Sequence, residues 1–260
     1  MFVLNESSEE FARPASATVS VTELSTPADL PTEEVHVWLA NLREFAPLNL
    51  RPLLSPDERA RAESFYFEND RNRFIVARGL LRKLLASYLN SEANQLTFDY
   101  LEKGKPSLIG ARDSWLKFNL AHSRDLALFA FSREREVGVD LEFIRDDVAE
   151  AELAERFFSE PEVQALSSLP AELRRQGFFN CWTRKEAYIK ARGAGLSMSL
   201  AEFSVSLMPG EAALLLQTQA EPDELKRWAM KLVDVPAGYA GALVAEGQDW
   251  QLKQFVLEEK

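Results

Sequence analysis

Two stretches of this sequence hold carboxylates at spacings that could do chemistry. The first is VGVDLE at residues 137–142, which alternates as a strand, so that Asp140 and Glu142 face one side and the valines and leucine face the other. Two carboxylates so close repel each other unless water or a cation lies between them. A hard ion such as Mg²⁺ takes oxygen ligands of this kind, together with substrate phosphate. The pair therefore predicts a metal site, or else two solvated acids on an exposed strand edge.

The second stretch lies in a helix predicted over residues 171–192, which ends at Gly193. Residues four apart share one helical face, so Glu186 and Lys190 project side by side. Taken alone, they could be a simple helix ion pair worth about 0.2–0.5 kcal/mol. Combined with the two strand carboxylates, they describe a site for metal-assisted chemistry on a phosphate.

Four other residues need an interpretation. Lys105 lies in a tight turn at residues 104–106 and could bind a phosphate as a point charge, although a solvated turn lysine is the simpler interpretation. His122 ends a predicted strand, where a histidine is more often exposed or hydrogen-bonded than functional. Trp182 and Cys181, both on the predicted long helix, are predicted to be packing residues of the hydrophobic core.

The elements that must position these residues alternate between helices and strands. A first strand starts at Glu34. Ser55-Pro56-Asp57-Glu58 begins a helix that runs to about residue 67, with a serine cap, proline in the first turn and acids near its positive end. A second helix at 69–90 carries the densest basic patch. The remaining predictions are strands at 96–101, 115–123, 126–132 and 137–144, helices at 148–158, 160–166 and 171–192, and a meander of strands at 202–207, 212–218, 227–235, 239–245 and 250–257.

A long helix followed by antiparallel strands occurs twice in this order, although no repeat is evident at the residue level. The sequence therefore predicts an α+β fold, a pseudo-dimer of two similar lobes, each with a long helix packed on a small antiparallel sheet. We expect an N-terminal lobe at residues 35–136 and a C-terminal lobe at residues 137–260. Residues 1–34, rich in Ser, Thr, Pro, Ala and Glu, are predicted to be a loose extension.

Composition excludes several classes of protein. Hydrophobic residues make up 46% of the 260 and charged residues 27%, which is typical of a soluble globular protein. One cysteine and two histidines, His36 and His122, exclude a disulfide framework, a multi-cysteine zinc site and a histidine cage. No secretory signal or bilayer-length apolar run is evident, so we expect a cytoplasmic protein without a membrane anchor. The net charge of −11 disfavours general nucleic-acid binding, which needs a basic surface.

Five blocks, taken in order, resemble the 4'-phosphopantetheinyl transferase superfamily: GKP at 104–106, FNLAHS at 118–123, VGVDLE at 137–142, FFSEPE at 157–162 and WTRKEAYIKARGAGL at 182–196. Their spacing resembles its longer, two-lobed, surfactin-synthetase-activating class, over roughly residues 55–207. The resemblance implies an enzyme that binds coenzyme A between its lobes. Such an enzyme transfers the 4'-phosphopantetheine group to a serine of an apo acyl or peptidyl carrier protein and releases 3',5'-ADP.

The resemblance also implies roles for individual residues. Asp140, Glu142 and Glu186 would coordinate Mg²⁺, with Mn²⁺ as a possible substitute, and Glu186 and Lys190 would be catalytic. The implied coenzyme A ligands are Arg61, Arg73, Arg78, Lys105, His122, Lys185 and Lys190, with the arginines at the 3'-phosphate. Glu162 matches a family block without an assigned role.

Two departures from the family pattern are evident. Ala121 stands where the family commonly has a serine, and Asp57-Glu58 replaces a region that is often more basic. Neither touches the three metal-binding carboxylates, so we expect an active, monomeric enzyme. The alternatives are a non-catalytic carrier-protein or coenzyme A binding protein of the same fold and, disfavoured by the net charge, a metal-dependent nuclease.

Overall fold

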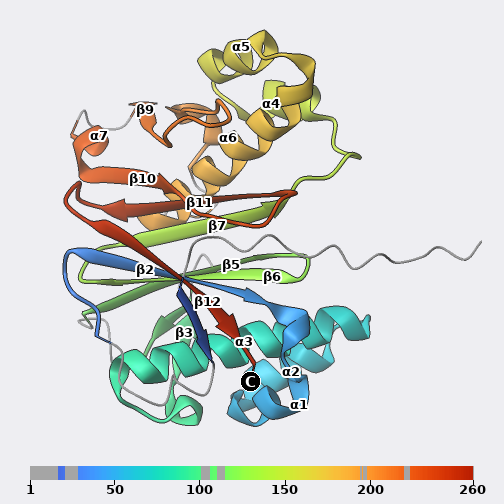
Figure 1. Ribbon diagram of the computed structural model, residues 1–260, viewed down its shortest axis with the longest axis vertical. Helices are drawn as coiled ribbons and strands as arrows, with labels where there is room; N and C mark the ends of the chain where they lie inside the picture. Colours follow the sequence, from blue (N-terminus) through green and yellow to red (C-terminus); the bar gives the residue numbers. More distant parts are fainter. Residues whose placement is uncertain are drawn as a thin grey trace, which may run out of the picture.

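The structure, a computed structural model, describes residues 17–20, 29–100, 106–109, 115–193, 195, 198–219 and 223–259. Two sheets lie face to face between two long helices (Figure 1). Helix α3 (Glu68–Leu89) covers the outer face of one sheet, and α6 (Ala171–Arg192) covers the outer face of the other. This helix–sheet–sheet–helix arrangement confirms the predicted α+β class with one long helix in each half.

The first sheet has five strands in the order β1-β12-β2-β6-β5. Strands β2 (Glu34–Asn41), β6 (Leu126–Arg133) and β5 (Leu116–Ser123) are antiparallel, as predicted. Strand β12 (Gln251–Glu258) runs parallel to both β2 and β1 (Ala17–Ser20), so the sheet is mixed.

The second sheet has three antiparallel strands in the order β10-β11-β7, with β10 at Trp228–Leu232, β11 at Tyr239–Glu246 and β7 at Val137–Phe143. The expectation that the chain ends in a meander within this half is wrong for β12. That strand crosses to the first sheet because its apolar side chains fill the first core: Phe255 stacks on Trp38, and Leu257 is fully buried. Its partner β1 comes from the segment expected to be a loose extension.

Each half follows one order: a strand, short helices, the long helix, a two-stranded hairpin and two sheet strands. The other elements of the first half are α1 (Pro47–Leu50), α2 (Pro56–Glu63), β3 (Phe98–Tyr100) and β4 (Pro106–Leu108). Those of the second half are α4 (Glu150–Phe157), α5 (Glu160–Ser168), β8 (Phe203–Val205), β9 (Leu215–Thr218) and α7 (Glu224–Arg227). The predicted duplication in element order is therefore present.

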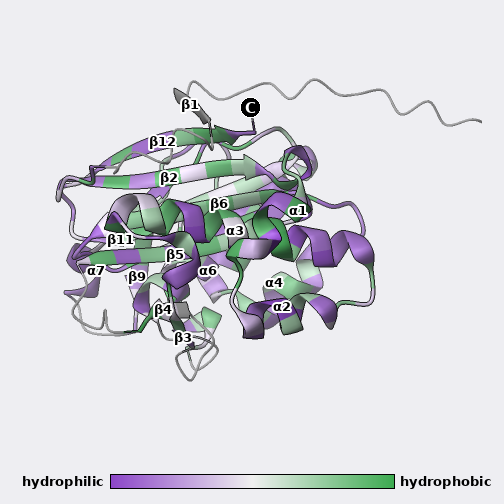
Figure 2. Ribbon diagram, turned by 90° about the horizontal axis from the view of Figure 1, so that it is seen from below, coloured by the Kyte–Doolittle hydropathy of each residue, from purple (hydrophilic) through white to green (hydrophobic). Residues whose placement is uncertain are grey.

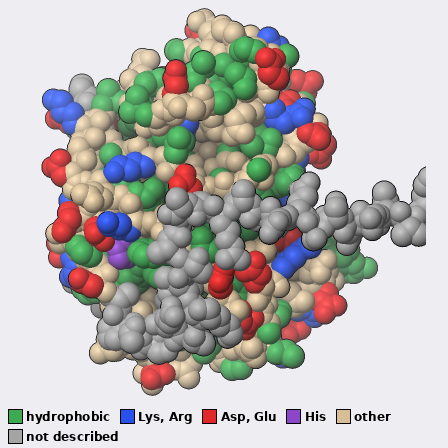
Figure 3. Space-filling model, in the orientation of Figure 1, with side chains coloured by type: hydrophobic (Ala, Val, Ile, Leu, Met, Phe, Trp, Pro, Cys, Tyr) green, Lys and Arg blue, Asp and Glu red, His purple; other side chains and the backbone are tan. Residues whose placement is uncertain are grey.

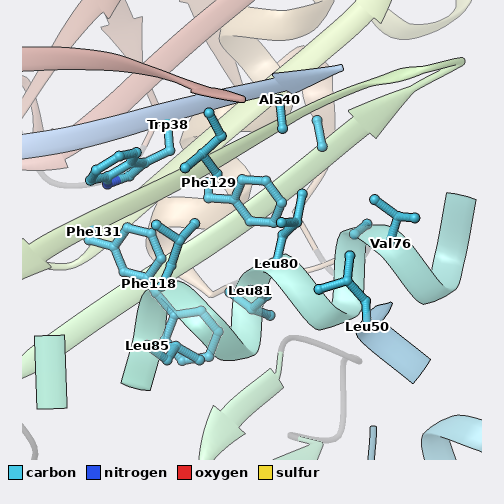
Figure 4. Packing of buried hydrophobic residues seen from close by; sticks show 14 of the residues in the cluster. Trp38, Ala40, Leu50, Val76, Leu80, Leu81, Leu85, Phe118, Phe129 and Phe131 are labelled. Carbon is cyan, nitrogen blue, oxygen red and sulfur yellow. The ribbon is translucent and has the colours of Figure 1, made fainter. Parts of the chain in front are cut away.

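Three cores hold the layers together. Leucines of α3, such as Leu80, Leu81 and Leu85, pack against Phe129 and Phe131 of the first sheet (Figure 4). A second core joins α6 to the second sheet, and a third lies between the two sheets. Hydrophobic residues are accordingly frequent in the central strands, whereas α2 is mostly hydrophilic (Figure 2). Among the described residues, no helix is both long and apolar enough to cross a membrane.

Candidate active site

The predicted carboxylates lie on β7, on the side that faces α6. Val137, Val139 and Leu141 point into the core between the sheets, so Asp140 and Glu142 point the other way. Lys190 of α6 contacts the first of them: its Nζ lies 2.6 Å from Asp140 Oδ1 and donates to the Val139 carbonyl at 3.3 Å. The strand and helix stretches singled out in the sequence therefore form one site.

Gly138 allows α6 to lie this close to β7. A Cβ at this position would lie 2.2 Å from the Ala187 carbonyl oxygen and 2.3 Å from the Ala191 nitrogen, inside any permitted contact. Those two alanines are the neighbours of Glu186 and Lys190 in α6. The missing side chain at Gly138 therefore sets how closely Glu186 and Lys190 approach the strand.

The carboxylates of this site are held in an unfavourable electrostatic environment. Burial raises the pKa of Glu142 above its ordinary value, and the negative charge of Asp140 raises it further. Burial and the charge of Asp140 raise the pKa of Glu186 in the same way, while Lys190 opposes the shift. Asp140 itself is only 5% exposed, and its Oδ2 is buried without a hydrogen-bond partner among the described residues.

These observations fit a hard divalent cation. Such an ion takes carboxylate oxygens as ligands, would satisfy Asp140 Oδ2 and would relieve the repulsion between the acids. The site is not a closed cage, because the described residues contain no group of three or more His, Cys, Asp or Glu side chains already arranged around a metal position. Instead, the Lys190 ammonium neutralises Asp140.

His122 lies at the end of β5, where its side chain reaches the surface but is partly covered by the surrounding protein. Desolvation by the surrounding protein lowers the pKa of His122, and the positive charges of Lys190 and Arg73 lower it further. The imidazole is therefore mainly neutral at pH 7 and can donate a hydrogen bond through one ring nitrogen. Arg73 and Lys190 therefore both lie close enough to His122 for their charges to act on it.

Arg73 lines a pocket of about 390 Å³ beside the β5–β6 turn. Asp125 of that turn accepts from Arg73 Nε at 2.7 Å, and its other oxygen pairs with Arg43 Nε, also at 2.7 Å. Asn69 and Asn72 line the same pocket. Two guanidinium groups and two amides make it a polar site suited to an anion. The sequence-based prediction missed Arg43, because no local motif marks it and only the fold brings it next to Arg73.

Lys185, predicted to contact coenzyme A, lies in the protein interior. Its side chain is fully buried, its Nζ lies 2.7 Å from Glu162 Oε2, and it donates to the Leu200 and Phe203 carbonyls. Glu162 in turn closes a capping box with Ser159 at the start of α5. We therefore assign Lys185 and Glu162 to the framework that holds α5, α6 and the β8–β9 hairpin together.

The other predicted cations lie in different surroundings. Arg78 is 6% exposed, pairs with Glu58 at 3.1 Å and lies over the Phe98 ring, so it too belongs to the framework. Arg61 is exposed on α2, with its guanidinium 5.6 Å from the centre of the Phe74 ring. Lys105 lies outside the described residues.

The interpretation of Trp182 and Cys181 as packing residues is confirmed. Trp182 is surrounded by the rings of Phe157, Phe158 and Phe178, and Cys181 is buried.

Two protein-family models match this chain. Residues 136–244 match the model described as the 4'-phosphopantetheinyl transferase superfamily. Residues 37–134 match the model described as 4'-phosphopantetheinyl transferase, N-terminal. The boundary between the matches falls at the start of β7, where the second half begins.

Several curated proteins are similar to this chain over most of their length. The 4'-phosphopantetheinyl transferase HetI of Nostoc sp. is 40% identical over 228 residues, which is 86% of this chain and 92% of that protein. The 4'-phosphopantetheinyl transferase psf-1 of Bacillus pumilus is 35% identical, over 70% of this chain and 76% of its own. The 4'-phosphopantetheinyl transferase Sfp of Bacillus subtilis is 29% identical, over 76% of this chain and 84% of its own.

Proposed function

The chain belongs to the 4'-phosphopantetheinyl transferase superfamily, and we propose that it transfers the 4'-phosphopantetheine group of coenzyme A to a serine of an apo carrier protein. The observation that carries this proposal is the cluster of Asp140, Glu142, Glu186 and Lys190, formed where β7 meets α6. One buried and two half-buried acids beside a lysine suit the handling of a phosphate group and its metal ion.

Coenzyme A lies across the junction of the two halves. Its 3'-phosphate end occupies the polar pocket that Arg43 and Arg73 line. Asp125 pairs with both guanidinium groups and already holds them in place. The neutral His122 ring donates a hydrogen bond to a phosphate oxygen, and Lys190 faces the pyrophosphate. Lys105 and Arg61 stay secondary candidates at the nucleotide end.

Asp140, Glu142 and Glu186 supply the oxygen ligands for a divalent ion, with Mg²⁺ expected and Mn²⁺ as a substitute. When bound, that ion supplies charge neutralisation at the pyrophosphate. The unpartnered Asp140 Oδ2 and the raised pKa values of Glu142 and Glu186 support this assignment.

Glu186 then acts as the general base. The carrier serine oxygen forms a bond to the β-phosphorus, the bond from that phosphorus to the bridging oxygen breaks, and 3',5'-ADP leaves. The serine proton passes to Glu186, directly or through one water, and burial raises the pKa of Glu186 toward the range suited to accepting it. Lys190 offsets the negative charge that develops on the leaving oxygen.

The partner is an acyl carrier protein, or a peptidyl or polyketide carrier domain, met in the cytoplasm by a monomeric enzyme. On the face seen in Figure 3, Lys and Arg side chains are interspersed with Asp and Glu, so the described surface there offers no continuous basic face of the kind nucleic acid requires. A non-catalytic carrier-protein or coenzyme A binding protein is the second candidate, and the complete catalytic cluster argues against it.

The deciding experiment measures the intact mass of a purified apo carrier protein after incubation with this protein, coenzyme A and Mg²⁺. A gain of one phosphopantetheine, absent when EDTA is added, is the expected result. No gain with several carrier types, while coenzyme A still binds, would favour the non-catalytic binder. No coenzyme A binding would overturn the proposal itself.

A further inference from the structure

The two sheets meet along β5 and β7, the edge strands of the first and second sheet (Figure 1). Side chains of one strand bond the backbone of the other. Asn119 Oδ1 accepts from the Val139 N–H at 2.9 Å, and Ser123 Oγ accepts from the Phe143 N–H at 3.0 Å. Both contacts join residues twenty apart, so β5 and β7 run parallel in one register.

This seam lies directly beneath the catalytic carboxylates. Val139 and Phe143 flank Asp140 and Glu142 on β7, and the β5 strand that holds Asn119 and Ser123 also carries His122. A shift of β7 along β5 would move both carboxylates relative to the histidine. The two side-chain contacts therefore fix the distance between the β7 carboxylates and His122, which matters to the proposed reaction.

Ser123 makes a second contact: its hydroxyl donates to Glu142 Oε2 at 3.0 Å. A serine hydroxyl has a single proton. Because the Phe143 N–H already donates to the oxygen, the proton is directed toward Glu142, and the Glu142 carboxylate is held in one orientation.

We propose that Asn119 and Ser123 are positioning residues that lock β7 in register with β5, and that Ser123 orients Glu142 for the divalent ion. This inference rests on the proposed function, because the ion and the reaction come from it. Ala121 lies between the two, buried, and its methyl group cannot accept a hydrogen bond, so these two side-chain acceptors lie on either side of it along β5.

The test measures Mn²⁺ binding by calorimetry with coenzyme A present, and the Mg²⁺ concentration that gives half-maximal transfer. Ser123→Ala is expected to weaken Mn²⁺ binding and raise the half-maximal Mg²⁺ concentration by about tenfold, since the loss of a ligand's hydrogen-bond partner costs about 10–100-fold in metal affinity. Ser123→Thr, which keeps the hydroxyl, is expected to restore binding to within about threefold.

The matched control is Ser132→Ala. Ser132 is a buried serine on the neighbouring β6 whose hydroxyl donates to the Arg135 carbonyl, away from Glu142. This variant should bind Mn²⁺ as the wild type does. Ser123→Cys keeps the size of the side chain but is a weak donor, so it tests the same contact if Ser123→Ala does not fold.

Unchanged Mn²⁺ binding in Ser123→Ala, or in Ser123→Cys where alanine does not fold, would overturn the inference, as would equal losses in the Ser132 control. Failure of the proposed function is distinct, because the wild type would then give no transfer at any Mg²⁺ concentration. A threonine variant as weak as the alanine variant would also overturn the assignment of the hydroxyl.

Discussion

The contact between Gly138 and α6 offers a sharp test of how the site is assembled. Gly138→Ala adds a single methyl group at a point where the backbone of the helix lies 2.2–2.3 Å from the new Cβ. The neighbouring atoms are the Ala187 carbonyl oxygen and the Ala191 nitrogen, which are backbone and cannot turn aside as a flexible side chain can. The helix itself must move.

The size of that movement follows from the contact distance. Ordinary contact begins at 3.4 Å, so α6 must retreat from β7 by roughly 1 Å. Overpacking of this kind costs about 1–3 kcal/mol of stability. A misplacement of about 1 Å in a catalytic group can cost about 10²-fold in rate. We therefore expect kcat/KM for transfer to fall about 100-fold, while the free energy of unfolding falls by about 1–3 kcal/mol.

The assay pairs carrier-protein transfer, followed by intact mass, with urea unfolding of the same preparation. The control is Gly241→Ala on the neighbouring β11, where a new Cβ would meet Val235 Cγ1 at 3.0 Å and Val233 Cβ at 3.4 Å, both side-chain atoms. This control should keep transfer within about threefold of the wild type. A Gly138→Ala enzyme with wild-type kcat/KM would refute the argument that backbone proximity sets the catalytic geometry.

Three further predictions address other parts of the site. Glu186→Gln should abolish transfer, measured by the mass of the carrier protein. Because the pKa of Glu186 is raised in the folded state, folding disfavours its charged form, and the stability of the wild type in EDTA should fall as pH rises from about 4.5 through that folded-state pKa. Thermal unfolding should show a smaller fall in stability for the glutamine variant. Lys185→Met leaves Glu162 buried without its cation and should lower the free energy of unfolding in urea by about 3–5 kcal/mol. Lys190→Met changes a side chain that is 30% exposed and should lower it much less, so equal losses of stability would contradict the framework role of Lys185. Arg43→Ala should raise KM for coenzyme A about tenfold with little change in kcat, and a comparable rise for dephospho-coenzyme A would refute placement of the 3'-phosphate in this pocket.

Local pattern predicted the elements that build the site. The helix expected at residues 171–192 has those bounds, and the alternation in β7 correctly placed its two carboxylates on one side. These features were predictable because periodicity and end signals act over a few residues. The strand β12 was not, since its pairing with β2 depends on a core more than two hundred residues away in the chain.

Charge alone could not separate cations that bind ligand from cations that hold the fold. Lys185 and Lys190 lie on one helix, five residues and therefore roughly 140° apart around its axis. One faces Glu162 in the core and the other faces Asp140 at the site. Only the packing of α6 on the second sheet decides which face is which. Arg78 and Arg73 divide in the same way on α3.

The duplication predicted from element order extends to individual residues, which no evident sequence repeat indicated. In the first half, Ser55 and Glu58 form a capping box, and Glu58 pairs with the buried Arg82 of α3 at 2.7 Å. In the second half, Ser159 and Glu162 form the same box, with Lys185 as the cation. Each cation also donates to two backbone carbonyls at the next hairpin. Arg82 donates to Ala93 and Leu96, just before β3, and Lys185 donates to Leu200, just before β8, and to Phe203, its first residue.

The two halves nevertheless differ at the proposed active site. In β2 the side chains that face α3 include Trp38 and Ala40, which fill the first core. Both strands bury two valines and a leucine between the sheets, and these residues align β7 with β2. In this alignment Asp140 and Glu142 of β7 take the positions of Trp38 and Ala40. A duplicated framework thus carries one set of proposed catalytic carboxylates, in the second half, whereas the first half carries Arg43, Arg73 and His122. If coenzyme A binds as proposed, each half supplies a different part of its site, and neither half alone should catalyse the transfer.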